Sequence, residues 1–208
     1  MVVTGLRSDA RVAGSVIVEA DGVRIASLPP EVLRELKLEV GRELSQSQHD
    51  AVVHASLVEG ARRVALRLLA SRPRAIQDLK RRLRERGHES SAIEESVARL
   101  QAAGLLDDVQ FAQHFVRVRA ARGHGPSRLI HDLLTVGVER RVAERAVSDV
   151  SEAEGVDAAA MARALAEKRA ARLAGLPGPK RRRRLLIYLA RRGFRGREVR
   201  EMVTELVG

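Results

Sequence analysis

The spacing Leu-x3-Leu-x3-Gly occurs three times in this chain and constrains its fold more than any other feature. The three occurrences are Leu79, Leu83 and Gly87; Leu129, Leu133 and Gly137; and Leu185, Leu189 and Gly193. Two leucines four residues apart lie on one face of a helix, and a glycine just beyond them can end that helix in a left-handed cap. After each glycine, apolar residues resume at the same offsets, which predicts a second helix. The chain is therefore predicted to contain three copies of one helical unit.

A further helical segment precedes each copy. These segments cover residues 46–70, 107–122 and 155–174. The resulting three-helix modules recur every ~50 residues, and such modules stack because none buries its apolar faces alone. We therefore predict a mainly α fold in which tandem three-helix repeats form an elongated, curved array. The predicted repeats are residues 46–104, 105–152 and 153–208.

Residues 1–45 have a different pattern. The β-branched segments Val16–Ala20 and Val23–Ala26 flank an Asp-Gly dipeptide that suits a tight turn, so a β-hairpin is expected. Pro30 and Glu31 favour the start of a short helix after it. A hairpin and one helix are not stable alone, so we expect this unit to dock on the repeats or to gain another strand.

The net charge of +11 is unevenly distributed along the chain. Residues 1–60 hold 6 basic and 9 acidic side chains, residues 61–150 hold 18 and 11, and residues 151–208 hold 14 and 7. The excess of +7 in each of the last two segments indicates a polyanionic partner. Arg replaces Lys even in the acidic first segment, so the abundance of arginine alone carries no functional meaning.

Composition excludes several classes of protein. The chain has no cysteine, which excludes disulfide scaffolds, thiolate nucleophiles and cysteine-ligated metals. No apolar run approaches the ~20 residues that a membrane span needs, so we expect no membrane association and a cytoplasmic location. The six histidines lack metal-ligand spacing, and no serine has a nucleophile-elbow context. We therefore expect no catalytic residues, no metal, no cofactor and no enzymatic activity.

Two short motifs admit both a chemical and a structural interpretation. The adjacent Asp107 and Asp108 could ligate Mg²⁺, but they directly precede a predicted helix, which favours a helix N-cap and a first-turn acid. The loop Gly123–Ser127 could cradle a phosphate, but it follows no strand and lacks the P-loop spacing. A tight turn between helices is the favoured interpretation of that loop, while a nucleic-acid phosphate there stays a weaker alternative.

Basic residues cluster on two of the predicted middle helices. The first cluster lies opposite the apolar stripe of Ile76, Leu79 and Leu83, so its side chains are predicted to face solvent. Two interpretations stay open: a solvated face with salt bridges to Asp78, Glu85 or Glu89, or an electropositive track for a polyanion, because the clusters recur on equivalent helices. Only four aromatic residues are present, so binding of a single strand would depend on phosphate contacts rather than on base stacking.

From about residue 60 onward, the pattern resembles the RecX regulatory proteins of bacterial recombination. The resemblance is carried by Ala65-Leu66-x2-Leu69-Ala70-x-Arg72, Asp78-Leu79-x3-Leu83-x3-Gly87, Leu100-x3-Gly104-Leu105-Leu106-Asp107-Asp108-x2-Phe111-Ala112, Arg119, Gly123-x-Gly125, Leu133, Gly137 and Arg191-Arg192-Gly193-Phe194. One departure is Ala75, where the family has Ser or Thr capping the next helix. Without that hydroxyl, we expect the cap to come from Ser71 or from water.

The resemblance implies a non-enzymatic regulator of the RecA recombinase. Such a protein binds the RecA filament on single-stranded DNA and inhibits its ATPase and strand exchange in DNA repair and the SOS response. We expect a monomer. The implied RecA- and DNA-binding residues are Arg72, Arg74, Arg81, Arg82, Arg119, Arg122, Arg128, Arg181, Arg182, Arg183 and Arg184. The sequence leaves two alternatives open: an autonomous nucleic-acid-binding protein, and a helical scaffold that binds another protein through a leucine face.

Overall fold

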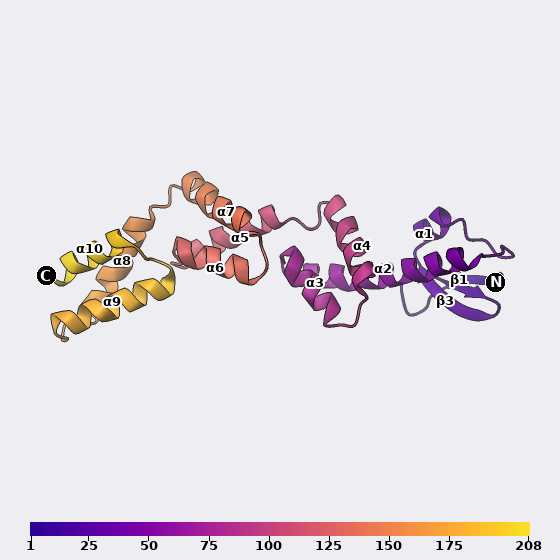
Figure 1. Cartoon of the computed structure of the whole chain (residues 1–208), viewed down its shortest axis with the longest axis horizontal. Helices are drawn as coiled ribbons and strands as arrows, with labels where there is room; N and C mark the ends of the chain where they lie inside the picture. Colours follow the sequence, from indigo (N-terminus) through magenta and orange to yellow (C-terminus); the bar gives the residue numbers. More distant parts are fainter. The chain divides into compact units, whose positions relative to one another are not determined.

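The computed structural model describes residues 1–208 and divides into two compact units (Figure 1). The first unit comprises Met1–Arg74 and Asp78–Leu106, and the second comprises Ala75–Gln77 and Asp107–Gly208. The three residues Ala75–Gln77 therefore pack with the second unit although they follow the first in sequence.

The first unit begins with a three-stranded antiparallel sheet in the order β1-β2-β3, followed by the short helix α1. The elements are β1 (Val3–Ser8), β2 (Val16–Ala20), β3 (Val23–Leu28) and α1 (Pro30–Glu35). The predicted hairpin of β2 and β3 is confirmed, and β1 is the additional strand that such a small unit needs. The inner face of the sheet buries Val3, Val18 and Leu28 against the start of the next helix.

Three helices complete the first unit: α2 (Gln46–Ser71), α3 (Ile76–Arg84) and α4 (Ser90–Ala102). The Ser45 side chain accepts from the Gln48 amide and the Gln48 side chain accepts from the Ser45 amide, which forms a capping box at the start of α2. This helix is long enough to contact both β3 and α4. Its first turns pack on the sheet through Val52 and Ala55.

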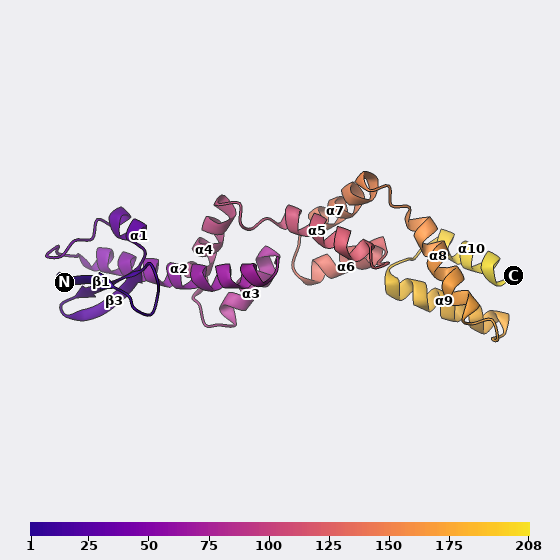
Figure 2. The same ribbon diagram turned by 180° about the vertical axis from the view of Figure 1, so that it is seen from behind.

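The second unit holds two successive three-helix groups, seen from opposite sides in Figures 1 and 2. The first group is α5 (Asp108–Ala120), α6 (Pro126–Thr135) and α7 (Arg140–Ala153). The second is α8 (Ala158–Ala171), α9 (Gly178–Arg192) and α10 (Arg197–Val207). Each group has its own aliphatic core, centred on Leu129 and Leu133 in the first and on Leu185 and Leu189 in the second.

The predicted internal repeat is confirmed as three groups of three helices, α2–α4, α5–α7 and α8–α10. We call them the first, second and third repeats. Gly87, Gly137 and Gly193 follow the middle helices α3, α6 and α9 with φ of +80°, +90° and +92°. These are the left-handed conformations expected of a glycine at a helix C-terminus, where a side chain would be strained. No helix in the structure is both long and apolar enough to span a bilayer.

Candidate partner and nucleic-acid interface

Four of the predicted site residues converge on one carboxylate in the first repeat. Asp78 lies on the first turn of α3 and is 5% exposed. Its Oδ2 atom lies 3.1 Å from Arg74 Nη1, 3.1 Å from Arg82 Nε and 3.9 Å from Arg72 Nη2, while its Oδ1 atom accepts from Arg81. The predicted salt bridge to Asp78 is confirmed, and four cations share this one anion.

Burial and pairing oppose each other at Asp78. Burial alone would raise the pKa of its carboxyl group, but hydrogen bonds from Arg82 and Arg74 outweigh burial and hold the pKa below its ordinary value. Asp78 is therefore an anion at neutral pH. Because four arginines share this one anion, the cluster of Asp78 and its arginines keeps a net positive charge.

The four arginines of this group differ in exposure. The side chains of Arg72 and Arg81 are 61% and 52% exposed, and that of Arg82 is 30% exposed. The Arg74 side chain is only 7% exposed, and its Nε atom also donates to the Leu68 carbonyl at 3.1 Å. Burial lowers the pKa of the Arg74 guanidinium. Arg74 therefore ties the end of α2 to α3, and the other three present free N–H groups to solvent.

A smaller group of the same kind forms in the second repeat. Arg119 and Arg128 share Asp132 at 3.3 and 3.4 Å. The Arg119 guanidinium also lies 4.7 Å from the centre of the Phe115 ring, a cation–π contact. Burial and the nearby Arg128 and Arg119 lower the pKa of His124, which keeps this histidine neutral in the group.

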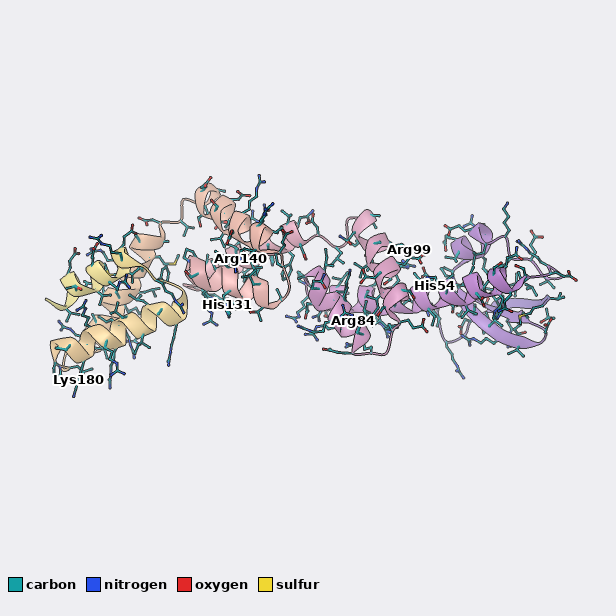
Figure 3. The ribbon with its side chains drawn as sticks, in the orientation of Figure 1. His54, Arg84, Arg99, His131, Arg140 and Lys180 are labelled. Atoms are coloured by element: carbon teal, nitrogen blue, oxygen red, sulfur yellow. The ribbon has the colours of Figure 1, made fainter.

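Arg128 also connects the second repeat to the third. Its Nη1 atom donates to the Arg191 carbonyl at 2.9 Å, and a hollow of about 780 Å³ opens beside this contact. The hollow is lined by residues of α6, α7 and the end of α9, among them His131 and Arg140 (Figure 3). Arg191 and Arg195 contribute two further guanidiniums that have no acidic partner within 4.0 Å.

Four of the five remaining predicted residues lie near the start of α9 in the third repeat, where Figure 3 labels Lys180. Arg182, Arg183 and Arg184 are exposed, and none has a carboxylate within 4.0 Å. The Arg181 side chain is half-buried and donates to the Val207 carbonyl at 2.6 Å. These arginines are therefore the least neutralised of the predicted set. Arg122 is also exposed and without an ion pair.

Asp107 caps α5 as predicted: its Oδ1 atom accepts from the amides of Val109 at 2.7 Å and Gln110 at 3.2 Å. Asp108 lies in the first turn of the same helix, as predicted, and its Oδ1 atom also accepts from the Ile76 amide at 2.9 Å. Nowhere in residues 1–208 do three His, Asp or Glu side chains group closely enough to hold a metal ion.

Ser71 does not cap α3, so that part of the prediction is wrong. The Ser71 hydroxyl donates to the Leu68 carbonyl at 2.7 Å at the end of α2, and Asp108 accepts the first amide of α3 instead. A carboxylate supplied from another helix replaces the local hydroxyl, so Ala75 is free to be fully buried. Burial raises the pKa of Asp108, although the hydrogen bond from Ile76 acts against it.

The loop Gly123–Ser127 is a tight turn between helices, and its amides are already bonded to protein. The Gly125 amide donates to the Arg192 carbonyl at 2.6 Å, and the Ser127 amide donates to the Gly193 carbonyl at 3.3 Å. The positive end of α6 thus meets the negative end of α9. The weaker alternative, a phosphate cradled by this loop, is wrong because the donors it requires are occupied.

Sequence reasoning named the arginines but did not separate their roles. The acids that organise them, Asp78 and Asp132, lie four residues from Arg82 and Arg128 along α3 and α6. That spacing places the two charges on one helical face and is visible in the sequence. The contact of Arg119 with Asp132 bridges two helices, and no local pattern predicts it.

The fold and its basic groups define a class of protein built from tandem three-helix repeats with arginine clusters on the middle helices. Family models for the first, second and third three-helix domains of RecX match residues 61–100, 107–147 and 156–203. The chain belongs to the RecX family.

Individual relatives and solved structures agree with this assignment. The chain is 39% identical to a protein named Regulatory protein RecX from Halorhodospira halophila over 143 residues, 68% of this chain and 85% of the relative. It is 37% identical to the protein of that name from Streptomyces coelicolor, over 66% of this chain and 72% of the relative. A crystal structure of regulatory protein RecX matches 98% of both chains with a TM-score of 0.79 at 22% identity, and so supports the fold.

Proposed function

We propose that this protein is a non-enzymatic regulator of the RecA recombinase that binds the RecA filament on single-stranded DNA and inhibits its ATPase and strand exchange. The proposed setting is DNA repair and the SOS response in the cytoplasm, with the protein acting as a monomer. The observation that carries the proposal is the match of all three RecX three-helix domains, in order, to the three repeats. The relatives carry the name of a regulatory protein.

The guanidinium groups support a partner that is itself anionic. Arg72, Arg81 and Arg82 are oriented by one buried carboxylate and keep N–H groups open to solvent. Such pre-oriented guanidiniums lose less side-chain entropy on binding carboxylate or phosphate than free ones do. Arg74 is excluded from the proposed interface because it is buried.

The proposal is tested by co-sedimentation with RecA filaments assembled on single-stranded DNA. We expect the protein to pellet with the filaments, and the double variant Arg72→Glu/Arg81→Glu to pellet about tenfold less, because two exposed charges are reversed at the proposed interface. The matched control is Arg7→Glu/Arg34→Glu, two exposed arginines that precede the three matched domains. Failure of the unmodified protein to pellet with filaments would overturn the proposal.

A further inference from the structure

In the first two repeats, the start of the middle helix packs against the repeat that follows. When the three Leu-x3-Leu-x3-Gly motifs are aligned on their first leucine, equivalent positions are occupied by Ala75–Asp78, Gly125–Arg128 and Arg181–Arg184. A side chain added at Gly137 would collide with Gln77, and one added at Gly193 would collide with Arg128 and lie 2.7 Å from the Gly125 carbonyl oxygen. In both cases the start of one middle helix touches the glycine that ends the middle helix of the following repeat.

The third repeat differs from the first two in the residue types at these positions. The first of these four positions holds a small residue in the first two repeats: Ala75 is fully buried, and a side chain added at Gly125 would lie 2.8 Å from the Phe194 ring. The equivalent positions in the third repeat are four arginines. Arg181 takes the place of Ala75 and Gly125 at the first of these positions, and a side chain of that size does not fit the close approach seen there in the first two repeats.

Helix stability does not explain these arginines either. The first turn of α9 contains no acid, and it carries Lys180 and Arg181 at the end of the helix where the dipole is positive. Cations at that position destabilise a helix, and neighbouring like charges add to the effect. An anion bound there would offset both penalties, whereas solvent alone does so weakly.

The extent and chemistry of the surface indicate the class of ligand. We define the α9 basic surface as the exposed residues Lys180, Arg182, Arg183, Arg184 and Arg191. Its ends are eleven residues apart, or about 16 Å along a helix, which is too long for one small anion and suits a chain of phosphates. Arginine also binds phosphate in a bidentate manner.

No aromatic platform accompanies this surface. The one tyrosine of the chain, Tyr188, has its ring within 5.5 Å of the Arg169 guanidinium and within 5.1 Å of that of Arg192. The Tyr188 ring already makes these two cation–π contacts, so we expect recognition to depend on the sugar–phosphate backbone, independent of base sequence.

We propose that the α9 basic surface binds the phosphodiester backbone of a polynucleotide directly, without RecA. This inference deepens the proposed function by dividing its arginines. Those of the first repeat are organised by Asp78 for the protein partner, and those of the third repeat, which no carboxylate neutralises, hold the nucleic acid. A protein bound to nucleic acid through α9 would remain on the DNA strand on which the RecA filament is assembled.

The test measures binding of a fluorescent oligothymidylate by anisotropy in the absence of RecA, with a duplex of equal length in a second arm. The variant is Arg182→Ser/Arg183→Ser/Arg184→Ser. We expect it to bind about tenfold more weakly, with the slope of log affinity against log salt smaller by about 2, since about 0.7 is lost per phosphate contact to a single strand. The comparison of the two arms tells whether a single strand or a duplex is the preferred source of the phosphates.

The matched control is Arg7→Ser/Arg145→Ser/Arg197→Ser, which removes the same charge from exposed arginines that are paired with Glu19, Asp149 and Glu201. We expect it to retain the affinity of the unmodified protein to within about twofold. The proposal is overturned if the unmodified protein does not bind either oligonucleotide, if both triple variants lose affinity equally, or if polyglutamate of equal charge competes as well as the oligonucleotide.

Two further measurements separate this proposal from a purely structural role of these arginines and from the proposed function. Because the three arginines are exposed and form no ion pair, the Arg182→Ser/Arg183→Ser/Arg184→Ser variant should melt within about 5 °C of the unmodified protein, and loss of the cooperative transition would assign these residues to the fold instead. Inhibition of RecA without any binding to oligonucleotide would overturn this inference and leave the proposed function standing. Oligonucleotide binding that depends on the α9 basic surface, without any effect on RecA, would support this inference and overturn the proposed function.

Discussion

At the scale of single residues, Asp78 shows how one buried carboxylate can order several arginines without neutralising them. It contacts a buried partner, Arg74, and three partners that reach solvent. A buried ion pair contributes little net stability but is costly to break from one side, because the remaining charge loses its only compensation. The same residue therefore links the packing of α2 on α3 to the display of charge.

The variant Asp78→Asn is expected to lower the free energy of unfolding by about 3 kcal/mol, because it leaves the buried Arg74 guanidinium without its anion. Urea unfolding followed by far-ultraviolet circular dichroism measures the change. The control is Glu85→Gln, which removes an exposed carboxylate 3.8 Å from Arg81 and should cost less than about 0.5 kcal/mol. Equal effects of the two variants would contradict the role given to Asp78.

The cost of Asp78→Asn should depend on pH. The pKa of Asp78 is lower in the folded state than in the unfolded chain, so its ionised form stabilises the fold above the unfolded value of about 4. That contribution is lost as pH falls through the lowered folded pKa. The difference in stability between the unmodified protein and the variant is therefore expected to be largest at neutral pH and to shrink in acid. A constant difference across this range would contradict the assignment.

The pH dependence of stability expected from Asp108 is opposite in sign to that expected from Asp78. Its pKa is raised, so the folded state binds a proton more readily than the unfolded chain, and the stability contributed by this group falls as pH rises through that range. Asn keeps the oxygen that accepts from Ile76 but carries no charge, so Asp108→Asn should be neutral or stabilising at pH 7. Asp108→Ala should cost about 1 kcal/mol because the cap is lost. Thermal melting distinguishes the two, and an Asn variant as unstable as the Ala variant would contradict the cap.

At the scale of elements, the contact between α6 and α9 depends on two glycines. Gly193 has φ of +92° and lies against Arg128, and Gly125 lies against Phe194, where an added side chain would come within 2.8 Å. The carbonyl groups that end α9 accept from the amides that begin α6, so each helix satisfies groups of the other. The leucine-glycine repeat thus encodes both the end of a helix and the contact to the preceding repeat.

Gly193→Ala is expected to destabilise the second unit by about 3 kcal/mol, from the left-handed backbone and the collision together. The control Gly155→Ala has φ of +60° and no atom within 4 Å of the added carbon, so it should cost only about 1 kcal/mol. Tyr188 lies on α9 and is the one tyrosine in a chain without tryptophan, so its fluorescence reports the transition. Equal costs at the two positions would contradict the packing role.

The helices, their order and the glycine caps were predictable because each follows from the spacing of apolar residues and glycines over a short stretch of sequence. The strand β1 was not predicted, since Thr4 and Gly5 interrupt its apolar alternation, and it becomes a strand only by pairing with β2. The cap from Asp108 to Ile76 was also missed, because it joins residues 32 positions apart. For the same reason, the sequence located the arginine clusters but did not separate buried Arg74 from exposed Arg81.

At the scale of the whole molecule, charge and repeat organisation coincide. The N-terminal sheet and α1 belong to the acidic first sixty residues, and the basic excess lies in the repeats that the RecX domain models match. Within the repeats, acids hold the guanidiniums of α3 and α6, and those at the start of α9 have no acid. This division predicts two separable activities, one toward a protein partner and one toward a polyanion.

Hydrolysis of ATP by RecA on single-stranded DNA, measured while this protein is titrated in, tests the central claim most directly. We predict that the rate falls with added protein and saturates, and that the Arg72→Glu/Arg81→Glu variant requires about tenfold more protein for the same inhibition. The Arg7→Glu/Arg34→Glu control should match the unmodified protein. An unchanged rate of hydrolysis at protein concentrations equal to those of RecA would contradict the assignment of this chain as a RecA regulator.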